Sequence, residues 1–323
     1  MLVAIFKSNH KIISVAVFLV TMLLWIPSFW SEVLMDVSGN SVLTDVQEIG
    51  EIKWLNYLVT GLYLSMQAIY LNYIVNKYKL ISTSSYVVAL LFVLLNSADA
   101  SFLIFNPIFI TNSFILIVLH QLFEIYNKEK VFALSFNTGL LVALATLVYF
   151  PAIIVFPLIW FTLIYLKISL WREFIISLFG FMLPLLFYTS YCFFTDQVNH
   201  FMNEAIFNNA LFLKNGASPH SFSFNVYYYV LALLLLLAGV NFLNYLNKSI
   251  VKIKKLMVVV LVMCFLLGFS IFINGRDYYA VYLMMTIPLT IMIANYFTEV
   301  KRKWLAEVFF LLLLLAIIFD YFS

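Results

Sequence analysis

Apolar residues fill most of the chain in long runs, and polar residues collect in the gaps between those runs. A run of about 20 apolar residues is long enough for one helix to cross the hydrocarbon core of a membrane. The pattern predicts eleven such helices, near residues 12–30, 54–75, 85–104, 108–126, 132–149, 152–168, 174–194, 225–246, 256–273, 277–297 and 304–321. The predicted fold class is therefore all-α: a polytopic membrane helix bundle that forms one integral membrane domain over residues 1–323.

Basic residues alternate between the gaps. Every second gap holds fifteen of the eighteen Lys and Arg residues: Lys7, Lys11, Lys77, Lys79, Lys128, Lys130, Lys167, Arg172, Lys248, Lys252, Lys254, Lys255, Lys301, Arg302 and Lys303. The other gaps hold only Lys53, Lys214 and Arg276. Because basic residues in short loops stay cytoplasmic, the N-terminus is predicted inside and, after an odd number of helices, the C-terminus outside.

Composition supports a membrane protein and argues against several other classes. The chain is 65% hydrophobic and 10% charged, with a mean hydropathy of +1.04, and a soluble domain could not bury so much apolar surface. The net charge of +3 follows from membrane orientation and does not indicate a nucleic-acid partner. The sequence lacks nucleotide-binding and hydrolase motifs. We expect a multi-pass protein of the bacterial inner membrane.

Two outer segments are long enough to carry chemistry. In the first, residues 31–53, Asp36 and Glu32 follow the predicted first helix closely, which would hold them at the outer membrane surface. In the second, apolar residues recur at helical spacing and predict an outer-face amphipathic helix near 196–213. Such a helix would cover an outward cavity. A structural alternative stays open: acidic outer loops can simply complement basic inner ones.

Ionisable residues inside apolar segments are costly and mark candidate sites. Asp99 lies in the outer third of the predicted third helix, where it is either functional or a cap on the following turn. His120 and Glu124 lie one turn apart near an inner helix end. They could hold a metal, but hydrogen bonding at the membrane edge is the expectation we favour.

Arg276 is one of three basic residues on the predicted outer face. Beside Tyr279, at the level of lipid head groups, its guanidinium suits the phosphate of a lipid. The alternative is a local ion pair with Asp277.

The residues around Arg276 carry a resemblance. Residues 275–282 read GRDYYAVY and run on to Ile287-Pro288, a stretch that resembles a late span of the C-type polyprenol-dependent glycosyltransferases. Residues 137–151, NTGLLVALATLVYFP, look like the small-residue helix and tight outer turn of the same enzymes. Together with Trp171-Arg172-Glu173-Phe174 and residues 180–184, they also resemble an uncharacterised inner-membrane family widespread in Bacteroidota.

The transferase resemblance implies roles for individual residues. Asp36, with Glu32 as a substitute, would be the catalytic base, and Arg276 and Tyr279 would hold the lipid phosphate. The outer cavity would also contain these polar residues: Asp99, Asp196, His200, Glu204 and Asp277. The family's paired acidic signature in the first outer loop is absent here, as is its large outer domain.

The expected function is sugar transfer from a polyprenyl-phosphate-linked donor at the outer face of the inner membrane. No resident cofactor is expected, although a divalent cation would be compatible with the chemistry. Two alternatives stay open: a non-catalytic membrane subunit or assembly factor of an envelope complex, with a membrane protein partner, and a lipid or solute transporter.

Overall fold

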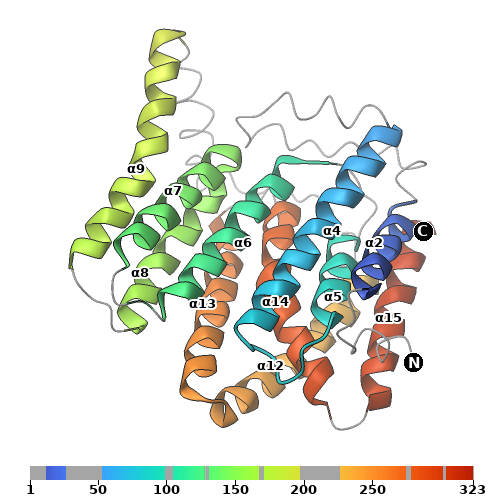
Figure 1. Cartoon of the computed structure of the whole chain (residues 1–323). Helices are drawn as coiled ribbons and strands as arrows, with labels where there is room; N and C mark the ends of the chain where they lie inside the picture. The colour runs from blue at the N-terminus through green and yellow to red at the C-terminus, as the bar shows by residue number, and fades with distance from the viewer. Residues whose placement is uncertain are drawn as a thin grey trace.

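The computed structural model describes residues 12–26, 53–98, 105–126, 128, 131–166, 171–196, 226–273, 278–300 and 303–322 (Figure 1). Within those residues every regular element is a helix: α2 (Ile12–Leu24), α4 (Lys53–Lys77), α5 (Val87–Asn96), α6 (Pro107–Ile125), α7 (Phe132–Val148), the 3₁₀ helix η4 (Phe150–Val155), α8 (Phe156–Tyr165), α9 (Trp171–Phe194), α12 (Val226–Lys248), α13 (Val251–Ile273), α14 (Tyr278–Glu299) and α15 (Lys303–Phe322). Each of the eleven predicted apolar segments coincides with one of these helices, the sixth with η4 and α8 together. The all-α prediction is confirmed for this part of the chain.

Six helices in the described part are long and apolar enough to cross a membrane. They are Trp54–Lys77, Pro107–Ile125, Trp171–Phe194, Val226–Lys248, Val251–Ser270 and Tyr279–Glu299. Shorter apolar helices cover Ile12–Leu24, Val87–Asn96, Phe132–Val148 and Phe150–Tyr165. A multi-pass helical membrane architecture follows from these helices.

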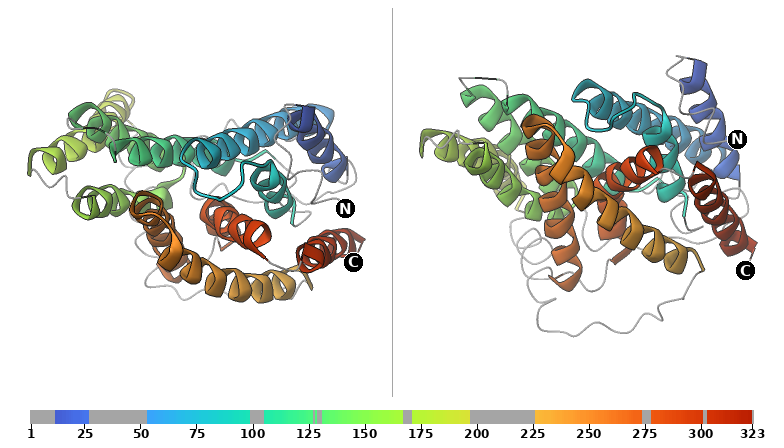
Figure 2. Two further views of the ribbon diagram at one scale, coloured as in Figure 1. Left: turned by 60° about the horizontal axis from the view of Figure 1, so that its bottom comes forward. Right: turned by 90° about the horizontal axis from the view of Figure 1, so that it is seen from below.

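The helices form two rows with a pair of helices between them (Figure 2). One row contains α2, α4, α6, α7 and α9, and the other contains α8, α13, α12 and α15. Helices α5 and α14 lie between the rows, and α14 packs against α5, α6, α12 and α13. Of the span within α14, 83% is buried, against 17% of the span within α9. Helix α14 is thus the central helix, and α9 is the most exposed of the six candidate spans.

Basic residues collect at one end of the bundle. The connections from α4 to α5 and from α12 to α13 lie at the lower end in Figure 1, as do the last turn of α14 and the first turn of α15. Lys77 ends α4, Lys248 ends α12, and Lys252 lies in the first turn of α13. We call this the basic end. The end of α7 and the start of α6 lie at the opposite end.

Helices α4 and α6 are joined by polar contacts at matching seven-residue steps. The Tyr63 and Ser113 hydroxyls are 2.8 Å apart, and seven residues further along both helices the Tyr70 hydroxyl lies 2.7 Å from His120 Nδ1. Another seven residues along α4, Lys77 Nζ lies 2.9 Å from His120 Nε2. A period of seven keeps side chains on one helix face over several turns. Polar side chains thus connect these two membrane helices, as is common within membranes.

Asn106 and Pro107 fix the start of α6. The Asn106 side-chain oxygen accepts a hydrogen bond from the backbone N–H of Ile108 at 2.8 Å, and Pro107 occupies the first turn. An asparagine cap satisfies a backbone donor that the helix leaves free, and proline has the φ angle that the first turn needs.

Candidate functional site

A chain of hydroxyl groups links three helices near the start of α14. The hydroxyls of Tyr227, on α12, and Tyr282, on α14, are 2.7 Å apart. Tyr282 donates to the carbonyl oxygen of Leu95, on α5, at 3.1 Å. Because the single phenolic proton of Tyr282 is used in that bond, Tyr227 must donate to Tyr282. Tyr227 is almost completely buried, at 1% exposure.

A second polar contact joins α5 and α14 one residue further along α5. Asn96 Nδ2 donates to the Thr286 hydroxyl at 3.1 Å and to the Phe92 carbonyl at 2.8 Å. Both Asn96 and Thr286 are fully buried. Buried polar groups are retained at little cost only when they are hydrogen-bonded. The start of α14 is therefore held in a specific position against α5.

Asp320 caps the beginning of α12. Its carboxylate oxygen Oδ2 accepts from the backbone N–H of Tyr227 at 3.3 Å. A carboxylate at this place satisfies a free backbone donor and interacts favourably with the positive end of the helix dipole. This contact brings the C-terminal part of α15 against the start of α12.

An apolar groove of 490 Å³ lies between α12 and α15, next to this cap. Its lining residues are Val226, Val230, Leu312, Leu315, Ala316, Ile318 and Phe319. The volume lies within the range of ordinary ligand sites. The groove thus runs beside a hydrogen-bonded layer made by Asp320, Tyr227 and Tyr282.

Most sequence-predicted site residues lie outside the described residues. These are Glu32, Asp36, Asp99, His200, Glu204, Arg276 and Asp277, and the predicted amphipathic helix near 196–213 lies there as well, apart from its first residue. Tyr279 is described: it lies in the first turn of α14, half-buried and packed against the apolar core. Asp196 is exposed just beyond α9, with φ of 56°.

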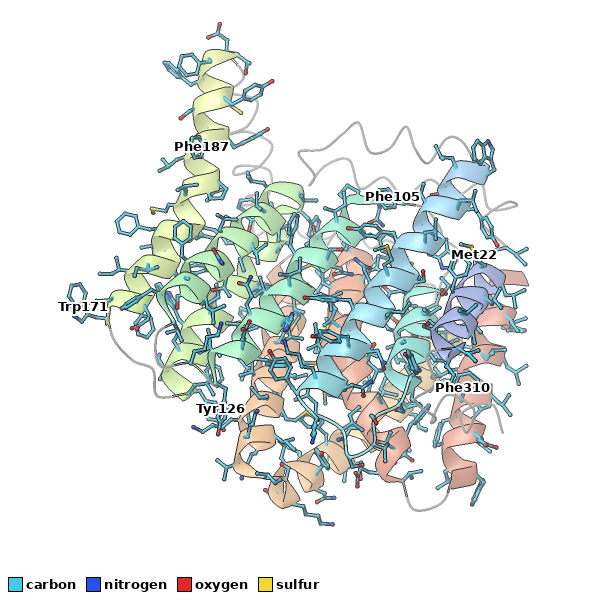
Figure 3. The ribbon with its side chains drawn as sticks, in the orientation of Figure 1. Met22, Phe105, Tyr126, Trp171, Phe187 and Phe310 are labelled. Carbon is cyan, nitrogen blue, oxygen red and sulfur yellow. The ribbon has the colours of Figure 1, made fainter. Side chains whose placement is uncertain are left out.

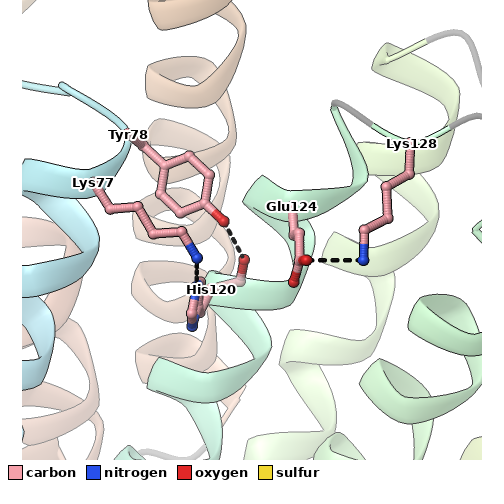
Figure 4. A network of polar contacts seen from close by, with 5 residues as sticks. All are labelled: Lys77, Tyr78, His120, Glu124 and Lys128. Atoms are coloured by element: carbon pink, nitrogen blue, oxygen red, sulfur yellow. Dashed lines mark hydrogen bonds and ion pairs between the residues drawn. The ribbon is translucent and has the colours of Figure 1, made fainter.

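His120 and Glu124 contact different partners. The His120 ring lies against Tyr70 and Lys77, whereas Glu124 forms an ion pair with Lys128 at 2.8 Å (Figure 4). In the part of the chain that the structure describes, no group of three His, Cys, Asp or Glu residues is arranged to bind a metal. The geometry fits the hydrogen-bonding interpretation of this pair.

Sequence reasoning did not identify Tyr227, Tyr282 or Asp320 as parts of one site. Tyrosines at helix ends are typical of the aromatic belt at a membrane surface, so neither Tyr227 nor Tyr282 indicated a specific contact. Only one signal was available: Asp320 is an acidic residue near the end of an apolar segment, where charges are unfavourable.

Residues 1–323 match the profile of a family described as "Family of unknown function (DUF6427)". This agrees with the expected likeness to an uncharacterised family. No curated protein matches the chain. No solved structure matches it.

Proposed function

This chain belongs to the DUF6427 family, and we propose that it is a glycosyltransferase-like membrane protein that uses a polyprenyl-phosphate-linked sugar. The proposal places the N-terminus inside, the C-terminus outside and eleven helices across a bacterial inner membrane, so that the end opposite the basic end faces outward. The groove between α12 and α15 carries the proposal, because it provides a place for a lipid chain beside a polar layer.

The lining of the groove favours a lipid chain over a polar solute. All seven lining residues are apolar, and Leu315 and Phe319 are 59% and 60% exposed. A groove of this kind on two membrane helices is open to the surrounding lipid, where hydrocarbon chains are the abundant molecules. Packing between apolar surfaces, and not exclusion of water, then determines which chain occupies it.

The head group of such a lipid would lie at the outward end of the groove. Arg276 and Asp277 directly precede α14 in the sequence, and Tyr279 is in its first turn. In the proposal Arg276 binds the lipid phosphate, since a guanidinium offers a planar fork of donors that stays charged. Tyr279 would donate a further hydrogen bond.

Asp36 would act as general base, with Glu32 as its substitute. It would accept the proton of an acceptor hydroxyl while that oxygen forms a bond to the anomeric carbon of the sugar. The bond between the sugar and the phosphate oxygen would break at the same time. The bonding electrons would stay on the departing lipid phosphate, whose charge Arg276 would stabilise.

A transfer assay with a polyprenyl-phosphate sugar tests this function. Asp36→Asn removes the base and is expected to lower the rate by about 100-fold or more. Arg276→Ala removes the phosphate ligand and is expected to raise KM for the lipid donor. Asp45→Asn, the same change elsewhere in the first outer segment, should leave the rate unchanged. If the Asp36 and Arg276 variants fold and remain as active as the parent, the proposed chemistry is wrong.

A non-catalytic membrane subunit is the second candidate, and α9 favours it. Its C-terminal half carries large exposed apolar side chains, among them Phe187 (labelled in Figure 3), which is 72% exposed, and Phe194, which is 84% exposed. Such a face suits a protein partner. Copurification of a stoichiometric membrane protein, without any polyprenyl lipid, would favour this candidate over the transferase.

A further inference from the structure

The basic end carries a polar cluster that the proposed transfer chemistry does not use. We propose that Lys77 and its neighbours bind the phosphodiester head group of an anionic lipid in the membrane leaflet at that end. This site is separate from the groove between α12 and α15 and does not depend on the proposed function.

Three rings hold the Lys77 ammonium in place. Its Nζ lies 2.9 Å from His120 Nε2 and 5.7 Å and 5.5 Å from the ring centroids of Tyr73 and Tyr78. Both distances are within the range of cation–π attraction. Within the described residues Lys77 forms no ion pair with a carboxylate, so its positive charge is positioned but not neutralised.

Lys77 also determines the proton positions of its neighbours. An ammonium can only donate, so His120 Nε2 accepts from Lys77 and the ring proton lies on Nδ1. His120 Nδ1–H then donates to the Tyr70 oxygen, 2.7 Å away, and the Tyr70 O–H proton can be donated to another acceptor. The remaining N–H groups of Lys77 and the Tyr70 hydroxyl are thus donors suited to phosphate oxygens.

Tyr78 holds the turn after α4 against α6, next to Lys77. Burial raises the pKa of the Tyr78 phenol above its usual value of 10.0, and the charge of Glu124 raises this pKa further. The phenol therefore stays protonated and donates to the backbone carbonyl of His120 at 3.4 Å. The bond anchors the turn after α4 against α6, which keeps the cage around Lys77 assembled.

Glu124, a carboxylate next to this cluster, does not neutralise its positive charge. Glu124 is paired with Lys128 at 2.8 Å (Figure 4), so two ammonium groups face one carboxylate. Basic pockets at the ends of membrane helices are recurrent sites for anionic head groups, and each Lys near the surface contributes to that attraction. Tyr73, half exposed at 50%, offers an aromatic face at the same level. This combination suits a phosphodiester.

The number of anionic lipids that stay bound to the purified protein measures binding at this site. The full chain would be purified in discs of equal parts phosphatidylcholine and phosphatidylglycerol, and the lipids that stay bound would be counted by native mass spectrometry. We expect the parent to retain phosphatidylglycerol preferentially. Lys77→Gln should lower this preference by about fivefold, because it removes an ammonium that the three rings hold at the head-group level. Lys79→Gln is the matched control: it removes the same charge two residues further on, outside the cage of rings, and it should lower the preference clearly less than Lys77→Gln does.

Two further variants separate binding from folding. Lys77→Arg keeps the charge and should keep most of the preference. His120→Asn keeps Lys77 but removes the ring that holds it, and should lower the preference while the protein still unfolds cooperatively. The proposal is overturned if Lys77→Gln and Lys79→Gln have equal effects, if neither Lys77→Gln nor His120→Asn has an effect, or if excess inorganic phosphate displaces the lipid, since the site would then take free phosphate.

Discussion

Replacing Gly180 or Gly139 by alanine is expected to separate α7 from α9 and to destabilise the protein. A Cβ atom on Gly139 would collide with the backbone carbonyl of Ser177, and one on Gly180 would collide with the carbonyl of Phe136. These neighbours are backbone atoms and cannot rotate away. Small residues allow two membrane helices to approach this closely. Overpacking costs about 1–3 kcal/mol, which equals or exceeds the ~1 kcal/mol by which alanine favours a helix over glycine.

Gly239 provides the control for this experiment. It lies within α12, and a Cβ atom there would meet nothing within 4 Å. Gly239→Ala should therefore be neutral or stabilise the protein by up to about 1 kcal/mol through helix propensity. Thermal unfolding of the three variants in the same detergent provides the comparison. Equal unfolding temperatures for all three variants would show that α7 and α9 are not in backbone contact.

Filling the groove between α12 and α15 is expected to expel the lipid. Ala316 lines the groove and is 4% exposed, so Ala316→Phe would place a ring where the lipid chain is proposed to lie. A ring that displaces about ten carbon–carbon contacts removes roughly 1–2 kcal/mol of dispersion, about a tenfold loss of occupancy. Copurifying polyprenyl lipid, quantified by mass spectrometry, measures this loss.

Two further variants test whether a loss of lipid comes from filling the groove. Leu312→Trp fills the groove from a position that is 43% exposed, where folding tolerates a larger side chain, and should have the same effect as Ala316→Phe. Val240→Phe enlarges a side chain on α12 that is 64% exposed and does not line the groove. It should leave the lipid content unchanged. Equal lipid recovery from all variants would remove the groove as a binding site.

The positions of the helices were largely predictable, because apolar runs between polar gaps mark membrane helices. The ends of the helices were less predictable. Residues 85–104 were predicted as one helix, but α5 is described only over Val87–Asn96, where Ser97 forms the cap. The run at 152–168 divides into η4 and α8, with Pro157 at the start of α8. Hydropathy depends on the side chains alone, so it does not show where a helix is capped or where a 3₁₀ helix changes to an α-helix.

The contacts between helices could not be predicted from one sequence. Tyr282 bonds to the carbonyl of Leu95, 187 residues away, and nothing in either segment indicates the other. Lys77 and His120 are an intermediate case, since the seven-residue spacing of polar residues on both helices was visible in the sequence. Only their pairing in space showed that the two spacings match. Lateral helix arrangement depends on packing, which a linear pattern of apolar residues does not encode.

The central claim is that a lipid chain lies between α12 and α15, with its head group at the end opposite the basic end. Photo-cross-linking of the membrane-embedded protein with a polyprenyl phosphate that carries a diazirine in its chain tests this most directly. Digestion and mass spectrometry would then locate the attached lipid. The claim predicts labelling concentrated in residues 226–230 and 312–319, and lost in Ala316→Phe. Labelling spread evenly over exposed apolar helices, with α9 marked as strongly as α12 and α15, would contradict it.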